Sequence, residues 1–83
     1  MSGKTIPLNV PDIGDAEKIE LVSWYAAVGE QVAEGQEICE LVTDKAAVPM
    51  ESPRAGKIAE IKREAGSTVV VGETLVLLEP IDP

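Results

Sequence analysis

The side chain with the clearest chemical potential is Lys45, which stands between two apolar, strand-like segments. Glu37–Val42 precedes the lysine and Ala46–Met50 follows it, with Thr43, Asp44 and Lys45 as a polar tip between them. This pattern predicts a β-hairpin that holds the lysine out into solvent. An Asp at the first position of a turn can hydrogen-bond the backbone further along, so we expect Asp44 to shape the tip. An exposed amine on an ordered tip could be joined by an amide to a carboxylic acid cofactor.

Catalytic chemistry within the chain itself is disfavoured. The sequence has no histidine, which excludes Ser–His and Cys–His nucleophile pairs and histidine metal ligands. The single cysteine, Cys39, allows neither an internal disulfide nor a thiolate metal cluster, and its apolar strand predicts a buried, inert thiol. A Schiff-base role for Lys45 would need a desolvated pocket, which a hairpin tip does not provide. We therefore expect a site of attachment, with no metal and no catalytic group.

Length and charge set the class of protein. With 83 residues the chain has room for one small domain, and 45% apolar residues suffice for a core. A net charge of −8 and only 2% aromatic residues disfavour nucleic acid and anionic membranes as partners. The acidity fits a protein partner with a positive face, or serves solubility alone. No apolar run is long enough to span a membrane, and Pro7 and Pro11 interrupt the first dozen residues. We expect a soluble, intracellular, monomeric domain.

The remaining apolar residues follow strand patterns, and no segment keeps a period near 3.6. Ile6, Leu8 and Val10 share one side of a first strand, which Pro7 confines to a sheet edge. The strand 18–27 changes parity between residues 21 and 22, which predicts a bulge or a strand that passes from one sheet to the other. Glycine or proline turns are expected at 28–30, 34–36 and 52–56, a very short strand around 32, and further strands at 57–64 and 74–79. Two prolines in the last four residues indicate that a linker begins at Pro80.

An internal repeat organises these elements. An offset of 37 residues superimposes two glycines and four apolar positions. The matched pairs are Leu21 with Ile58, Gly29 with Gly66, Val32 with Val69, Gly35 with Gly72, Ile38 with Leu75, and Leu41 with Leu78. Two copies of a small all-β unit would pack as a two-sheet sandwich or flattened barrel with an approximate two-fold axis. Because Lys45 maps onto Asp82, we expect the tip and the chain's end to lie at opposite ends of the domain.

Four motifs carry a resemblance to a known family. Val10–Gly14, Val28–Val32, Thr43–Ala46 and Pro53–Ile58 resemble the lipoyl domain of the acyltransferase (E2) component of 2-oxo acid dehydrogenase complexes. The similarity covers roughly residues 5 to 79, with the Asp-Lys-Ala tip as its most specific part. It implies two four-stranded antiparallel sheets in a flattened barrel, the biotinyl/lipoyl or hammerhead fold. The domain would occupy residues 1–79 and the linker 80–83.

The resemblance also implies a function. Lipoate would be amide-linked to Lys45 by a lipoate-attaching enzyme. The arm would then serve the E1 decarboxylase, the E2 acyltransferase core and the E3 dihydrolipoamide dehydrogenase, so the domain is a carrier and the parent chain the enzyme. Thr43, Asp44 and Ala46 would contribute to turn geometry and recognition. A surface loop corresponds to the one that relatives use to recognise their own E1; it consists of Asp12, Ile13, Gly14, Asp15, Ala16 and Glu17.

Alternatives stay open at this point. Biotinyl carrier domains share the fold but typically place the modified lysine between methionines, and neither neighbour of Lys45 is Met. An unmodified, protein-binding module on the same fold is the alternative from another class. Val42 and Pro49 stand where many relatives have acidic residues, which leaves the choice of E1 open. Ala46 favours the pyruvate or branched-chain type, and Trp24–Tyr25 leans towards the branched-chain type. A bacterial cytoplasm is favoured over the mitochondrial matrix.

Overall fold

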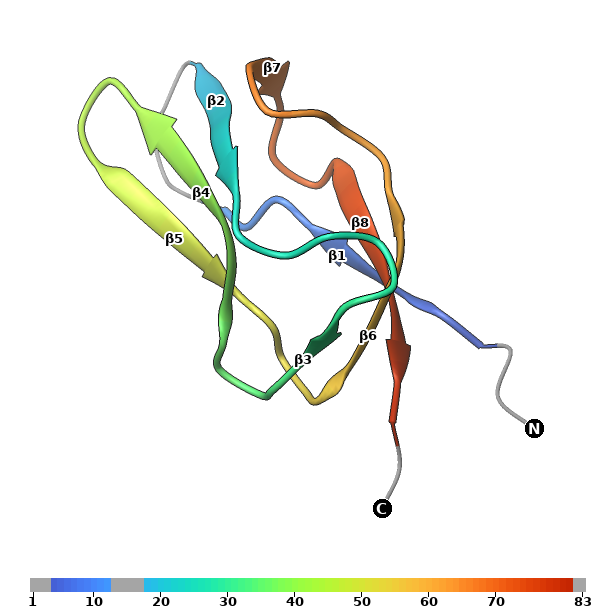
Figure 1. Cartoon of the computed structure of the whole chain (residues 1–83). Helices are drawn as coiled ribbons and strands as arrows, with labels where there is room; N and C mark the ends of the chain where they lie inside the picture. The colour runs from blue at the N-terminus through green and yellow to red at the C-terminus, as the bar shows by residue number, and fades with distance from the viewer. Residues whose placement is uncertain (1–3, 13–17, 82–83) are drawn as a thin grey trace.

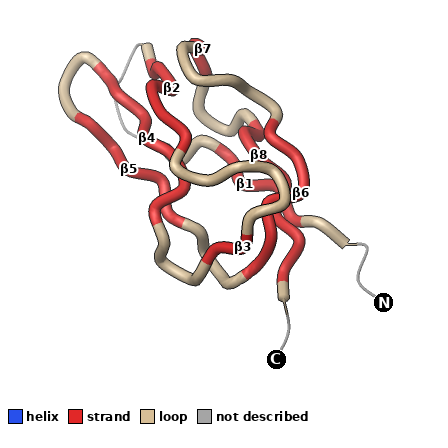
Figure 2. The backbone as a smooth tube through the Cα atoms, in the orientation of Figure 1, coloured by secondary structure: helices blue, strands red, loops and turns tan. Residues whose placement is uncertain are grey.

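The computed structural model describes residues 4–12 and 18–81, and these form strands and turns only (Figure 1, Figure 2). The strands are β1 (Ile6–Asn9), β2 (Ile19–Trp24), β3 (Gln31–Val32), β4 (Glu37–Thr43), β5 (Ala47–Glu51), β6 (Gly56–Ile61), β7 (Ser67–Val69) and β8 (Thr74–Pro80). In the described part of the chain there is no helix long and apolar enough to cross a membrane. The predicted all-β class is confirmed.

Two four-stranded sheets make up the fold. One has the order β1-β8-β6-β3 and the other β5-β4-β2-β7, and every pairing is antiparallel. The six largest fully buried side chains are Leu21, Ile38, Leu41, Ile58, Leu75 and Leu78. These are three of the pairs that the 37-residue offset predicts, so the repeat builds the core. Cys39 is also fully buried, as its apolar strand indicates.

The repeat is visible in backbone detail as well. The offset of 37 carries the bounds of β2 and β4 onto those of β6 and β8 residue for residue. A bulge interrupts β2 between Leu21 and Ser23, and the equivalent bulge lies in β6 between Ile58 and Glu60. The four repeat glycines all have positive φ, from +82° to +96°, which explains why glycine recurs there. If each strand is replaced by its repeat equivalent, the order β1-β8-β6-β3 becomes β5-β4-β2-β7. The equivalent strands are β1 and β5, β2 and β6, β3 and β7, and β4 and β8.

Strands β1 and β5 belong to the repeat too, although the offset of 37 does not reveal them. They correspond at an offset of 42, which aligns Pro7–Pro11 with Pro49–Pro53. Equivalent backbone bonds support the match, because Val10 N–H donates to Glu73 O at 2.8 Å and Ser52 N–H to Gln36 O at 2.9 Å. Both are edge strands, which Pro7 predicts for β1, and Pro49 stands at the equivalent place in β5. The change of offset makes the β1–β2 connection five residues longer than the β5–β6 connection.

The strand bounds differ from expectation at several places, and β7 is a strand where the sequence pattern predicted none. β2 ends at Trp24 and β6 at Ile61, each three residues early, because the chain leaves the sheet soon after the bulge. β8 continues through Pro80, one residue further than expected, and pairs there with Gly56. Proline is tolerated at this place because the ladder ends with that pair.

The molecule is elongated, with principal extents of 41 × 20 × 19 Å. The β4–β5 turn projects at the upper left of Figure 1, whereas the last residues of β8 lie at the bottom. β1 begins close to the end of β8, since Ile6 pairs with Leu78. The described chain therefore has both of its ends away from the hairpin tip. Asp82, which the repeat matches with Lys45, lies outside the described residues.

Candidate functional site

The predicted hairpin is present, and Lys45 occupies its tip. The β4–β5 ladder ends at the pair Val42–Ala47, and the Thr43 N–H then donates to Ala46 O at 2.8 Å. Asp44 and Lys45 form the two-residue connection. Neither has a positive φ, so the turn is not one of the I′ or II′ types that match the twist of the flanking strands. The turn therefore needs support beyond the backbone.

Thr43 supplies that support through its side chain. Its hydroxyl oxygen accepts hydrogen bonds from Lys45 N–H and Ala46 N–H, both at 3.1 Å, and the hydroxyl donates to Ala46 O at 3.2 Å. A hydroxyl offers one donor and two acceptor positions, and all three are used. Among the described residues the hydrogen bonds to the turn backbone come from Thr43, and the contribution of Asp44 to the tip stays a prediction. Thr at the first position of a four-residue turn was the available signal for this role.

The Lys45 side chain is exposed, and its Nζ has no hydrogen bond or ion pair with the part of the chain that the structure describes. A small cleft beside the tip is lined by Lys18, Glu20, Val42, Thr43 and Asp44, without Lys45 itself. Within residues 4–12 and 18–81 no group buries the amine or encloses its end. The arrangement suits an amide-linked group that extends beyond the surface, and it does not suit a Schiff-base lysine, which needs desolvation.

The predicted partner loop falls mostly outside the described residues. Asp12 is described and exposed, whereas residues 13–17 are not described. The recognition role of this loop stays a prediction. The repeat adds one fact about it, because the five residues by which the β1–β2 connection exceeds its counterpart fall in this segment.

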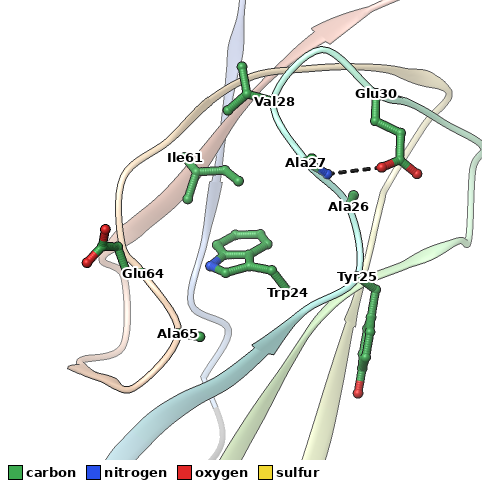
Figure 3. Close-up of a pocket in the computed structure, with 9 residues that line it drawn as sticks. All are labelled: Trp24, Tyr25, Ala26, Ala27, Val28, Glu30, Ile61, Glu64 and Ala65. Atoms are coloured by element: carbon green, nitrogen blue, oxygen red, sulfur yellow. Dashed lines mark hydrogen bonds between the residues drawn. The ribbon is translucent and has the colours of Figure 1, made fainter.

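A shallow surface pocket lies away from the tip, and Figure 3 shows its lining. Trp24 and Ile61, which are repeat equivalents, meet in it, so it straddles the approximate two-fold axis. Trp24 Nε1–H donates to Arg63 O at 2.9 Å, and Ala27 N–H donates to a Glu30 carboxylate oxygen at 3.1 Å. These contacts fix the β2–β3 and β6–β7 connections. Among the described residues no group of three potential metal ligands exists, here or elsewhere.

The fold and the site together define a class of protein. Two repeat-related antiparallel sheets with one exposed lysine on a β-hairpin tip are the design of biotinyl and lipoyl domains. The family model described as "Biotin-requiring enzyme" matches residues 6–78, and the chain belongs to this biotin–lipoyl family. Within the family it resembles the lipoyl domains of E2 acyltransferase components.

Three relatives carry the finer likeness. The chain is 41% identical over 73 residues to the lipoamide acyltransferase component of the branched-chain alpha-keto acid dehydrogenase complex of Pseudomonas aeruginosa, covering 87% of this chain and 17% of that protein. It is 35% identical over 71 residues to the dihydrolipoyllysine-residue acetyltransferase component of the pyruvate dehydrogenase complex of Bacillus subtilis, covering 84% and 16%. The solution structure of the lipoyl domain of the Azotobacter vinelandii 2-oxoglutarate dehydrogenase complex superimposes with a TM-score of 0.74 at 30% identity, covering 88% of this chain and 94% of that one. The chain thus spans about a sixth of these two acyltransferases and nearly all of the isolated domain.

Proposed function

We propose that this chain is a lipoyl carrier domain in which lipoate is amide-linked to Nζ of Lys45. The observation that carries the proposal is an exposed lysine on an ordered hairpin turn, remote from both ends of the described chain. When bound, the lipoyl group supplies a dithiolane that can carry an acyl group and two electrons between active sites. The domain delivers this chemistry to other enzymes and supplies no acid–base or metal chemistry itself.

The chain's own residues perform the positioning. Strands β4 and β5 hold the turn at one end of the molecule, and β8 leads the chain away at the other (Figure 1). A tether that continues from β8 therefore leaves the tip free to enter another protein's active site. Tethering replaces a diffusing substrate by one at high effective concentration, which is the physical advantage of a carrier domain.

Lipoate is favoured over biotin by two observations. The relatives described above are lipoyl-type acyltransferase components and a lipoyl domain. Lys45 is flanked by Asp44 and Ala46, whereas biotinyl domains typically have methionine on both sides. A biotinyl carrier and an unmodified protein-binding module are the alternatives that the experiment below separates.

The proposed partners are the E1 decarboxylase, the E2 acyltransferase core and E3 of a 2-oxo acid dehydrogenase complex, with a lipoate-attaching enzyme acting first. The branched-chain and pyruvate types are favoured, because relatives from both have 35% to 41% identity. The five additional residues of the β1–β2 connection support its proposed role in E1 recognition, since the second half folds without them. We place the parent protein in a bacterial cytoplasm in preference to the mitochondrial matrix.

The test is an intact mass measurement after incubation with ATP, lipoate and a lipoate-attaching enzyme. We expect one lipoyl group per chain, located on Lys45 by peptide mapping. The variant Lys45→Arg should gain no mass, whereas the matched control Lys57→Arg, at an exposed position on β6, should be modified like the wild type. A biotin ligase with biotin forms the parallel arm. Biotin attachment without lipoate attachment would favour the biotinyl alternative, and no attachment in either arm would leave the protein-binding module.

A further inference from the structure

Exposure alone does not distinguish Lys45 from the other lysines. The chain contains five, namely Lys4, Lys18, Lys45, Lys57 and Lys62, and all five are exposed. Lys62 forms an ion pair with Glu60 at 3.0 Å on the protein surface. An attaching enzyme that modifies a single lysine must therefore recognise a structural feature in addition to an accessible amine.

The local backbone provides the difference. Lys45 is the second residue of a two-residue turn, and its own N–H is held by the Thr43 hydroxyl at 3.1 Å. The same oxygen holds the next N–H, that of Ala46, also at 3.1 Å. The two strands would by themselves favour a mirror-image turn with positive φ at Asp44 and Lys45, a conformation that these residues do not adopt. The hydroxyl contacts thus hold the chain in a conformation that the strand twist does not impose.

From this geometry we infer that Thr43 is a positioning residue for lipoate attachment, whose hydroxyl fixes the turn that makes Lys45 the selected lysine. The inference rests on the proposed function and deepens it, since it assigns the selectivity of the modified site. Thr43 does not contact the reacting amine. It acts on the backbone of Lys45 and Ala46, to which its hydroxyl forms three hydrogen bonds.

The kinetic signature of such a role is specific. Without the hydroxyl the turn would sample several conformations, and only a fraction of molecules would present the lysine correctly. The apparent affinity falls by that fraction, so we expect the KM for the domain to rise by about tenfold or more in Thr43→Val. Once bound, the same amine reacts in the same site, so kcat should stay within about twofold of the wild-type value.

The experiment compares attachment kinetics for three variants of the full chain with the lipoate-attaching enzyme, ATP and lipoate. Thr43→Val removes the hydroxyl and keeps the side-chain shape, whereas Thr43→Ser keeps the hydroxyl. Thr68→Val makes the same substitution at an exposed position on β7 and is the matched control. We expect a raised KM only for Thr43→Val, with Thr43→Ser and Thr68→Val close to the wild type.

Amide hydrogen exchange supplies a second readout that does not depend on the enzyme. The amides of Lys45 and Ala46 should be protected in the wild type and in Thr43→Ser, and should exchange faster in Thr43→Val. Wild-type KM in Thr43→Val, or an equal loss in Thr43→Ser, would overturn the inference while the proposed function stood. Failure of the wild-type chain to be modified at all would instead overturn the proposed function, and this inference with it.

Discussion

At the scale of single residues, two side chains in the β4–β5 hairpin differ in their exposure to solvent, and this difference determines what each can do. Lys45 at the tip is exposed, and its environment leaves the amine available. Cys39, earlier on β4, is fully buried. Burial raises the pKa of the Cys39 thiol from 9.0 to about 12, with a smaller contribution from the charge of Glu37. Cys39 is therefore a packing residue whose thiol stays protonated at neutral pH.

The raised pKa of Cys39 predicts a loss of stability at alkaline pH. The folded protein holds the thiol proton more tightly than the unfolded chain does. The stabilisation is thus complete below pH 9 and declines as the pH rises towards 12. Across that window the free energy of unfolding should fall by up to about 1.4 kcal/mol per pH unit from this group. Urea unfolding between pH 8 and pH 10.5 measures the slope.

Cys39→Val provides the control, because the repeat places the fully buried Val76 at the equivalent position on β8. This variant should match the wild type near neutral pH and lose stability less steeply above pH 9. The hydrogen bond to Glu40 also raises the pKa of Tyr25, but both proteins share that contribution and it cancels in the comparison. Parallel slopes in the two proteins would contradict the assignment to Cys39.

At the scale of elements, the close approach of β6 to β8 depends on Gly56. A Cβ added there would lie 2.7 Å from the backbone oxygen of Glu79 and 2.9 Å from Cγ of Leu78. Both contacts are closer than packed atoms tolerate, and the first is with backbone, which cannot rotate away. Gly56 pairs with Pro80 in the last step of the β6–β8 ladder. Its lack of a side chain therefore lets the end of β8 join the sheet.

Gly56→Ala should accordingly destabilise the domain by about 1–3 kcal/mol, the usual cost of forcing extra volume into a packed site. Denaturant unfolding gives the value. Ala59→Ser, at an exposed position on the same strand, is the control and should change the free energy of unfolding by less than about 0.5 kcal/mol. An unfolding free energy for Gly56→Ala equal to that of the wild type would show that β8 can shift without cost.

The elements were predictable from sequence where the repeat constrains them. Identical glycine spacing and matching apolar positions revealed the core pairs, because burial and positive φ leave few residue types to choose from. The correspondence of β1 with β5 is not apparent from the repeat, since the longer β1–β2 connection changes the offset and only Pro7/Pro49 and Pro11/Pro53 are identical. At the site, the position of Lys45 followed from strand patterns. The family resemblance names Thr43, Asp44 and Ala46 together for turn geometry. Only the three-dimensional geometry shows that the Thr43 hydroxyl forms the bonds to the turn backbone.

At the scale of the whole molecule, the approximate two-fold symmetry relates the hairpin tip to the end of β8. The hairpin tip follows β4, and the chain's continuation follows its repeat equivalent β8 (Figure 1). Exchanging the two halves exchanges these ends, so the proposed attachment site lies apart from the end of β8 in a molecule 41 Å long. A carrier domain benefits from this separation, because the tether cannot obstruct the attached group.

The most direct test of carriage is the intact mass of the lipoylated domain after incubation with an E1 decarboxylase, thiamine diphosphate and a 2-oxo acid. The branched-chain and pyruvate types should be assayed side by side, with branched-chain 2-oxo acids and pyruvate as the respective substrates. We predict the gain of one acyl group on the Lys45 peptide with at least one of the two, and no gain in Lys45→Arg treated identically. Acyl transfer to Lys45→Arg, or no acylation of the lipoylated wild type by either decarboxylase, would contradict the account.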